Sequence, residues 1–187
     1  MAPSNEQFKQ AVAVLRKGGV VVFPTETAYG LAADTGNPRA AGKIFAIKGR
    51  GHEKKLPAIA ASAAMAQRYA EISPKLMNIA RAFWPGPLTV VGSRAAVRVS
   101  PHPIARALSK ALGRPIFSTS ANVSGMPTCY SVVEVSKQFA RRRLQPDFAL
   151  DVGPLPRRKP STIIAEQDGR IVVLRQGSLR IPKRYVA

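Results

Sequence analysis

VVVFPTETAYGL at residues 20–31 and PIFSTSAN at residues 115–122 are the two stretches that decide the fold of this chain. In each, a short apolar run typical of a buried strand leads into small hydroxyl and amide side chains. α/β sheets commonly present such polar groups at strand ends to build a ligand site. Between the two stretches, Lys48 and Arg50 flank Gly49. Hydroxyls, an amide and paired cations suit a ligand that carries phosphate and carboxylate groups.

Caps, turns and apolar periodicity predict the elements around these two stretches. Helices are predicted from Ser4 to about 17, from Pro38, from Ser62, from Ser73, over 104–112, and from Ser131 to about 143. Further strands are predicted over 56–60, 88–91 and 96–99 (a hairpin), near Phe148, and over 161–165 and 171–174. Helices and strands alternate early and strands cluster late. This order predicts an α/β or α+β fold with a mixed sheet and flanking helices.

The length of 187 residues favours a single domain with a full hydrophobic core. Residues 153–160 are a stiff basic loop, and too little chain follows it to form a second domain. The single cysteine, Cys129, excludes an internal disulfide framework. No apolar run approaches the roughly 20 residues of a membrane span, and no signal-peptide pattern opens the sequence. We therefore expect a cytoplasmic protein with no membrane partner.

The net charge is the outlier of the composition. Twenty-nine Lys and Arg residues against ten Asp and Glu give a net charge of +19 and a pI near 11.3. A field of this sign attracts polyanions, and tRNA or double-stranded RNA is the first candidate. The alternatives are a solubility trait or a bias towards arginine. Aromatic residues make up only 6%, which argues against recognition of single strands by base stacking.

Seven segments resemble the YrdC/Sua5 family in order and spacing. They are residues 24–31, 48–50, 84–89, 97–99, 118–125, 161–163 and 174–177. The resemblance covers about residues 8–177, and several independent matches are far more specific than one short motif. The length is similar to the short TsaC-type form, a single domain over 1–187 without the additional C-terminal domain of longer Sua5 proteins. The resemblance implies a twisted mixed sheet around a large basic concave surface.

The resemblance also implies a nucleotidyltransferase, L-threonylcarbamoyladenylate synthase. Such enzymes use L-threonine, bicarbonate and ATP and release pyrophosphate. The product serves the t6A37 modification of tRNA, so the implied partners include the transferase proteins of that pathway. The carbamate oxygen is the nucleophile, so catalysis must come mainly from positioning and charge stabilisation. Mg²⁺ would arrive with ATP, and no protein metal ligand is expected.

The family pattern gives each candidate residue a role. Catalysis falls to Lys48 and Arg50, which would flank the phosphates and the carbamate. Binding of threonine and carbamate is implied for Thr25, Thr27, Tyr29, Arg98 and Ser161. Nucleotide binding is implied for Lys48, Arg50, Lys54, Ser118, Ser120, Asn122 and Arg175. One departure is Gly51, where many relatives have proline, and it predicts a more mobile loop.

Several of these residues also have purely structural interpretations. Thr25 and Thr27 suit an ST turn that bonds its own backbone, and residues 118–122 suit a turn held by hydroxyl and amide bonds. Glu26 suits either the orientation of cations and the substrate amine or a structural ion pair. For the whole chain, the alternative is an RNA-binding protein of the YrdC/YciO type without synthase activity. A third interpretation is a carbamoyl-transferring relative similar to one domain of HypF.

Overall fold

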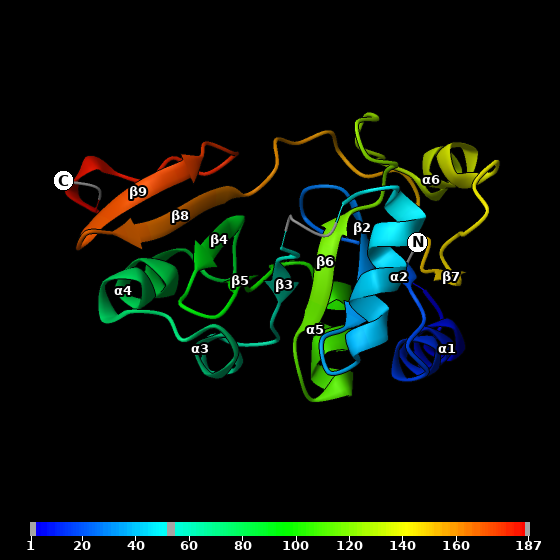
Figure 1. The fold of residues 1–187 in the computed structure, drawn as a ribbon, viewed down its shortest axis with the longest axis horizontal. Helices are drawn as coiled ribbons and strands as arrows, with labels where there is room; N and C mark the ends of the chain where they lie inside the picture. Colours follow the sequence, from blue (N-terminus) through cyan, green and yellow to red (C-terminus); the bar gives the residue numbers. More distant parts are fainter. Residues whose placement is uncertain (1–2, 52–54, 186–187) are drawn as a thin grey trace.

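The computed structural model describes residues 3–51 and 55–185, and its centre is one twisted nine-stranded sheet (Figure 1). The strands are β1 (Val21–Pro24), β2 (Tyr29–Asp34), β3 (Ala58–Ile59), β4 (Leu88–Val91), β5 (Ala96–Arg98), β6 (Ile116–Ser120), β7 (Phe148–Ala149), β8 (Thr162–Gln167) and β9 (Arg170–Arg175). The helices are α1 (Asn5–Arg16), α2 (Pro38–Lys48), α3 (Ala63–Ala70), α4 (Pro74–Phe83), α5 (Pro103–Leu112), α6 (Val132–Phe139) and the short 3₁₀ helix η1 (Lys183–Tyr185).

The sheet is mixed, as the sequence predicts. Its strand order is β7-β1-β2-β6-β3-β5-β4-β8-β9. The pairs β1–β7, β3–β5 and β4–β8 are parallel, and the other five pairs are antiparallel. The predicted hairpin is β4–β5, closed by a bond from Gly92 N to Ala95 O. Strands from the two ends of the chain therefore share one sheet.

Helices cover both faces of the part of the sheet that holds β1 and β2. Val22 and Leu31 pack in one core cluster with α2 and α6. Val21 and Ala32, which point to the opposite face, pack in another with α1 and α5. A third cluster joins α3 and α4 to β4, β5 and β8. Burial on both faces explains why residues 20–23 are a continuous apolar run.

Two details of the sequence prediction were wrong or incomplete. β2 was missed, because Gly30, Ala32 and Ala33 have little intrinsic strand preference and pairing with β1 and β6 imposes the conformation. α6 ends at Phe139 rather than near residue 143, since Arg142 N bonds to Phe139 O in a turn. The Ser4 capping box and the ends of α1 are confirmed. Among the described residues, no helix has the length and apolarity to cross a membrane.

A ten-residue segment joins the two parts of the sheet on one side. Residues 151–160, which we call the strap, run from the β7 side of the molecule across to β8 (Figure 1). Three prolines stiffen it, at positions 154, 156 and 160. The strap passes beside the cavity described next, and two of its residues, Arg158 and Pro160, line that cavity.

Candidate active site

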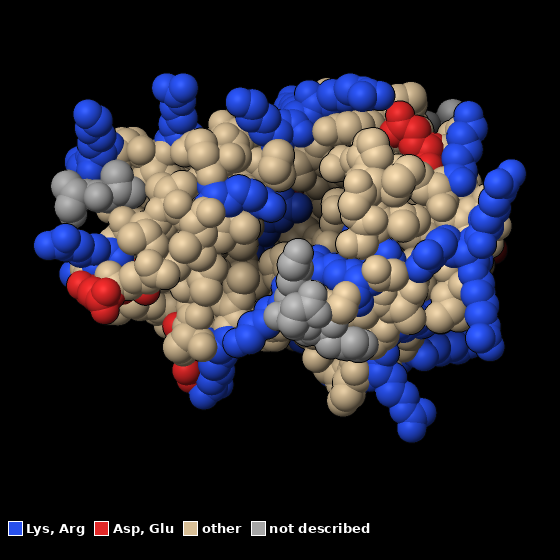
Figure 2. All heavy atoms as spheres, turned by 45° about the horizontal axis from the view of Figure 1, so that its top comes forward, with Lys and Arg blue, Asp and Glu red and all other residues tan. Residues whose placement is uncertain are grey.

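A cleft of about 440 Å³ lies between the two parts of the sheet. This volume falls in the range of small-molecule and cofactor sites. Figure 2 shows a hollow on one face, with Lys and Arg side chains on its rim and deeper inside. The cations that line the cleft are Arg50, Lys55, Arg98, Arg158 and Arg175. Among the described residues, no Asp or Glu lines it, so the cleft favours an anionic ligand.

The cleft brings together most of the site residues predicted from the sequence. They are Thr25, Thr27, Tyr29, Arg50, Arg98, Ser118, Ser120, Ser161 and Arg175. Lys48 and Asn122 lie beneath its surface, outside the lining. Lys54 is outside the described residues.

Thr25 and Thr27 form the turn between β1 and β2. Thr25 Oγ1 donates to Ala28 O at 2.7 Å and accepts from the backbone N–H groups of Thr27 (3.2 Å) and Ala28 (3.3 Å). This is the ST turn that the sequence offered as an alternative. Both threonines still line the cleft, so a turn role and a binding role are compatible.

Arg50 lines the cleft, and one of its donors has no partner among the described residues. Its Nε is buried and has no hydrogen-bond partner among the described residues. Buried guanidinium donors are normally paired, since an unpaired one costs free energy. Arg50 follows Gly49, which ends α2 in the left-handed conformation (φ 62°) and turns the chain towards the cleft. Arg50 therefore lines the cleft with a guanidinium that is not fully paired by the described residues.

Lys48 occupies a different environment from Arg50, although only one residue separates them. It is 3% exposed, and its Nζ donates to Ser120 O at 2.5 Å and Asn122 O at 2.7 Å. Burial, and secondarily the charge of Arg50, lower the pKa of Lys48 to about 8. The ammonium holds the end of β6 in place beneath the cleft.

The 118–122 segment combines strand and turn. Ser118 and Ser120 lie on β6 and line the cleft, as does Thr119 between them. The Asn122 side chain donates from Nδ2 to Val123 O (2.9 Å) and Met126 O (2.7 Å). The serines are thus placed for ligand contact, whereas Asn122 shapes the turn that follows.

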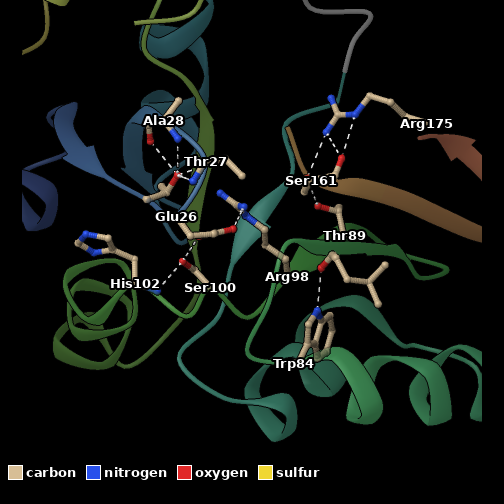
Figure 3. Close-up of polar contacts among 12 residues, drawn as sticks. Glu26, Thr27, Ala28, Trp84, Thr89, Arg98, Ser100, His102, Ser161 and Arg175 are labelled. Carbon is tan, nitrogen blue, oxygen red and sulfur yellow. Dashed lines mark hydrogen bonds and ion pairs between the residues drawn. The ribbon is translucent and has the colours of Figure 1, made fainter. Parts of the chain in front are cut away.

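Ser161 and Arg175 form one hydrogen-bonded group with Thr89 (Figure 3). Ser161 Oγ lies 2.9 Å from Thr89 Oγ1, and Arg175 Nη2 donates to Ser161 Oγ at 3.1 Å. Arg175 also donates to Ser161 O from Nε (3.1 Å) and Nη2 (2.8 Å). These bonds fix the guanidinium at the end of β9, on the wall of the cleft.

Arg98 and Glu26 form a buried ion pair between β5 and the β1–β2 turn (Figure 3). Arg98 Nη1 donates to Glu26 Oε1, and Ser100 Oγ donates to Glu26 Oε2. Both oxygens of the carboxylate are therefore engaged within the protein. Of the two interpretations of Glu26, the structure has the ion pair, which also orients a cation.

Tyr29 ties the strap to the sheet. Its ring is fully buried, and its hydroxyl donates to Gly153 O (2.8 Å) and accepts from Val152 N (3.0 Å). Asp151 Oδ1 lies 3.2 Å from the same hydroxyl. Burial is the main cause that raises the pKa of Tyr29 to about 12. The hydroxyl therefore anchors the strap beside the cleft, and its hydrogen bonds are made within the protein.

Sequence reasoning gave no role to several residues that the structure places at the cleft. They are Lys55, Thr89, Thr128, Tyr130 and Arg158. Ser100 was also given no role, and it lies behind the lining, where it bonds to Glu26. Thr89 interrupts the apolar strand 88–91, and that signal could have identified it. Arg158 and Tyr130 come together only because the strap folds back, where Tyr130 O accepts from Leu155 N at 2.7 Å. Among the described residues, no group of three His, Cys, Asp or Glu could hold a metal ion.

Comparison with known proteins agrees with this architecture. The model of the Sua5/YciO/YrdC family, described as "Telomere recombination", matches residues 13–177. Threonylcarbamoyl-AMP synthase of Vibrio cholerae serotype O1 is 37% identical over 190 residues, covering 92% of this chain and 98% of the relative.

Two solved structures share the fold. Sua5 of P. abyssi complexed with L-threonine superposes with a TM-score of 0.82 at 34% identity over 91% of this chain. The match spans about half of that protein, 54% of its length. YciO of E. coli gives a TM-score of 0.80 at 27% identity, covering 95% and 93% of the two chains. With a cleft at the place where the seven segments meet, the chain belongs to the Sua5/YciO/YrdC family.

Proposed function

We propose that this chain is an L-threonylcarbamoyladenylate synthase that uses L-threonine, bicarbonate and ATP. The observation that carries the proposal is the cleft itself, in which cations from separate segments surround hydroxyl groups and Arg50 Nε has no described partner. ATP, carbamate and threonine are all anionic or carry a carboxylate. The names of the relatives, threonylcarbamoyl-AMP synthase and Sua5 complexed with L-threonine, support the same substrates.

The chemistry requires little more than positioned charge. The threonine amine and bicarbonate condense to a carbamate with loss of water. A carbamate oxygen then attacks the α-phosphorus of ATP, and the bond to the bridging oxygen breaks to release pyrophosphate. Mg²⁺ enters with ATP and is held by phosphate oxygens and water. In this proposal Arg50 and Arg175 bind phosphate oxygens, and Arg98 binds the threonine carboxylate.

The buried Lys48 has an indirect part in this scheme. Its ammonium orders the backbone that carries Ser118 and Ser120, and its charge adds to the positive potential of the cleft. The strap, with Arg158 and Pro160 at the cleft, limits access of water to the adenylate. Lys54 keeps the weaker phosphate role implied by the resemblance.

The test is pyrophosphate release by the purified protein with each substrate omitted in turn. We expect release to require ATP, bicarbonate and L-threonine together. Arg50→Met should lower kcat/KM by roughly 100-fold, the usual effect of removing one donor to a developing charge. The matched control is Arg39→Met, since Arg39 is exposed on α2 and outside the cleft. Equal activity of the two variants would remove Arg50 from the site, and ATP binding without turnover would favour a YciO-like role.

RNA contact is a second proposal, and the net charge of +19 favours it. Lys and Arg side chains lie on several sides of the hollow in Figure 2, so RNA phosphates would approach the same face from which an adenylate product leaves. We propose tRNA and the transferase proteins of the t6A pathway as partners, in the cytoplasm. Affinity for double-stranded RNA should fall steeply as salt rises. An absence of binding at low salt would contradict the RNA proposal and leave the synthase proposal untouched.

A further inference from the structure

The arginine that the proposed function assigns to the threonine carboxylate is held by a carboxylate outside the cleft lining. Glu26 has a side chain 9% exposed, and its two oxygens accept from Arg98 Nη1 and Ser100 Oγ. Arg98 and Ser100 are two residues apart at the end of β5. Arg98 lines the cleft and Glu26 does not. The carboxylate therefore lies behind the guanidinium as seen from the ligand.

This arrangement leaves part of the guanidinium available. Arginine carries five N–H donors in a rigid planar fork. Glu26 engages Nη1, and no described residue accepts from Nε or Nη2 of Arg98. Because the guanidinium is planar and its Nη1 is held by Glu26, its remaining donors point in a fixed direction. A free arginine side chain would lose conformational entropy on binding, and a fixed one has lost it already.

Glu26 also offsets repulsion inside the cleft. Arg98 and Arg175 are close enough for the charge of Arg98 to contribute to the lowered pKa of Arg175, after burial. Two guanidinium groups that share one cleft repel each other when no ligand is bound. The carboxylate of Glu26 neutralises one of them from the protein side.

We infer that Glu26 and Ser100 are positioning residues that orient Arg98 towards the carboxylate of the amino-acid substrate. The inference rests on the proposed function. The competing role for Glu26 is direct contact with the substrate amine. The two roles predict different results when Arg98 is also changed, because a positioning residue acts only through the residue that it positions.

The experiment is a double-mutant cycle with Glu26→Gln, Arg98→Met and the double variant. L-threonine is titrated at saturating ATP and bicarbonate, and ATP is titrated at saturating threonine. We expect Glu26→Gln to raise KM for threonine at least about tenfold, with KM for ATP changed less than about twofold. When Arg98→Met is already present, Glu26→Gln should raise KM for threonine by less than about twofold more. If the factors by which the two single changes raise KM for threonine multiply in the double variant, the inference is overturned. Glu26 would then contact the substrate itself.

Two further variants keep the test decisive. Ser100→Ala removes one bond to Glu26 and the bond that Ser100 Oγ accepts from His102 N at 3.1 Å, without leaving a charge unpaired. It should raise KM for threonine by a smaller factor. If Glu26→Gln fails to fold, the test rests on Ser100→Ala. An unchanged KM for threonine in that variant would overturn the inference. Asp34→Asn is the matched control, since Asp34 is buried, bonds to Gly36 N at 2.8 Å and lies outside the cleft lining.

The wild-type protein separates this inference from the proposed function. If it neither binds L-threonine in calorimetry nor releases pyrophosphate, both the proposed function and the assignment of Arg98 to that carboxylate fall. If it does both, and Glu26→Gln and Ser100→Ala keep the wild-type KM for threonine, only the positioning inference falls.

Discussion

Tyr29→Phe isolates the contribution of the strap, because it removes one oxygen and keeps a fully buried ring. The hydroxyl has one proton to donate, to Gly153 O at 2.8 Å, and it accepts from Val152 N at 3.0 Å. Two net hydrogen bonds of 0.5–1.5 kcal/mol each give a loss of about 2 kcal/mol in the free energy of unfolding. For a chain of this size, that corresponds to a decrease in Tm of roughly 4–8 °C.

The assay is guanidinium unfolding followed by the fluorescence of the single tryptophan, Trp84, together with a thermal scan. Tyr69→Phe is the control, because Tyr69 is partly buried and its hydroxyl bonds to none of the described residues. We expect that control to change stability by less than about 0.5 kcal/mol. We also expect Tyr29→Phe to raise KM for ATP several-fold, since the strap carries Arg158 to the cleft. Equal losses in the two variants would refute the idea that the Tyr29 hydroxyl anchors the strap.

Four other predictions concern the cleft and the elements around it. The pKa of Lys48 is lowered to about 8, so its charge is lost as pH rises past 8 instead of near 10.5. We expect kcat/KM for ATP to fall on an alkaline limb near pH 8 that is missing from the pH profile of Lys48→Met. Gly177→Ala should destabilise the protein by at least about 2 kcal/mol in thermal unfolding, because the new Cβ would lie 2.1 Å from Pro160 O. Gly42→Ala, on α2 with open space around it, should stabilise by about 0.5–1 kcal/mol in the same scan. Ser161→Ala should raise KM for ATP about three- to tenfold with little change in Tm, since it frees Arg175 from one bond; an unchanged KM would contradict the role of that bond.

Local features of the sequence were sufficient to predict most helices. Ser4, Ser62 and Ser73 each accept from a backbone N–H at the start of a helix, and these caps act within one turn. β2 could not be predicted in this way, because its conformation depends on β1 and β6, and β6 comes from far along the chain. The site residues were predicted mainly from the resemblance to the family, because short motifs such as Lys-Gly-Arg are not specific on their own.

The two cations of the Lys-Gly-Arg segment show what the sequence could not give. In the sequence, Lys48 and Arg50 are two cations separated by one glycine, and the prediction placed both at the phosphates. In the structure, Lys48 is the last residue of α2 and turns under β6, while the left-handed Gly49 directs Arg50 into the cleft. Ser100 was overlooked for a related reason, since its role depends on Glu26, 74 positions earlier.

The sheet order has a consequence for how the protein is made. The cleft needs Thr25 and Thr27 from the first turn of the sheet and Arg175 from the end of β9. Domains begin to fold during synthesis, from the N-terminus onwards. A nascent chain that has built β1, β2 and β6 still lacks the wall formed by Ser161 and Arg175. We therefore expect the complete cleft to form only once β9 has left the ribosome, so a shorter nascent chain should bind the proposed substrates more weakly than the finished protein.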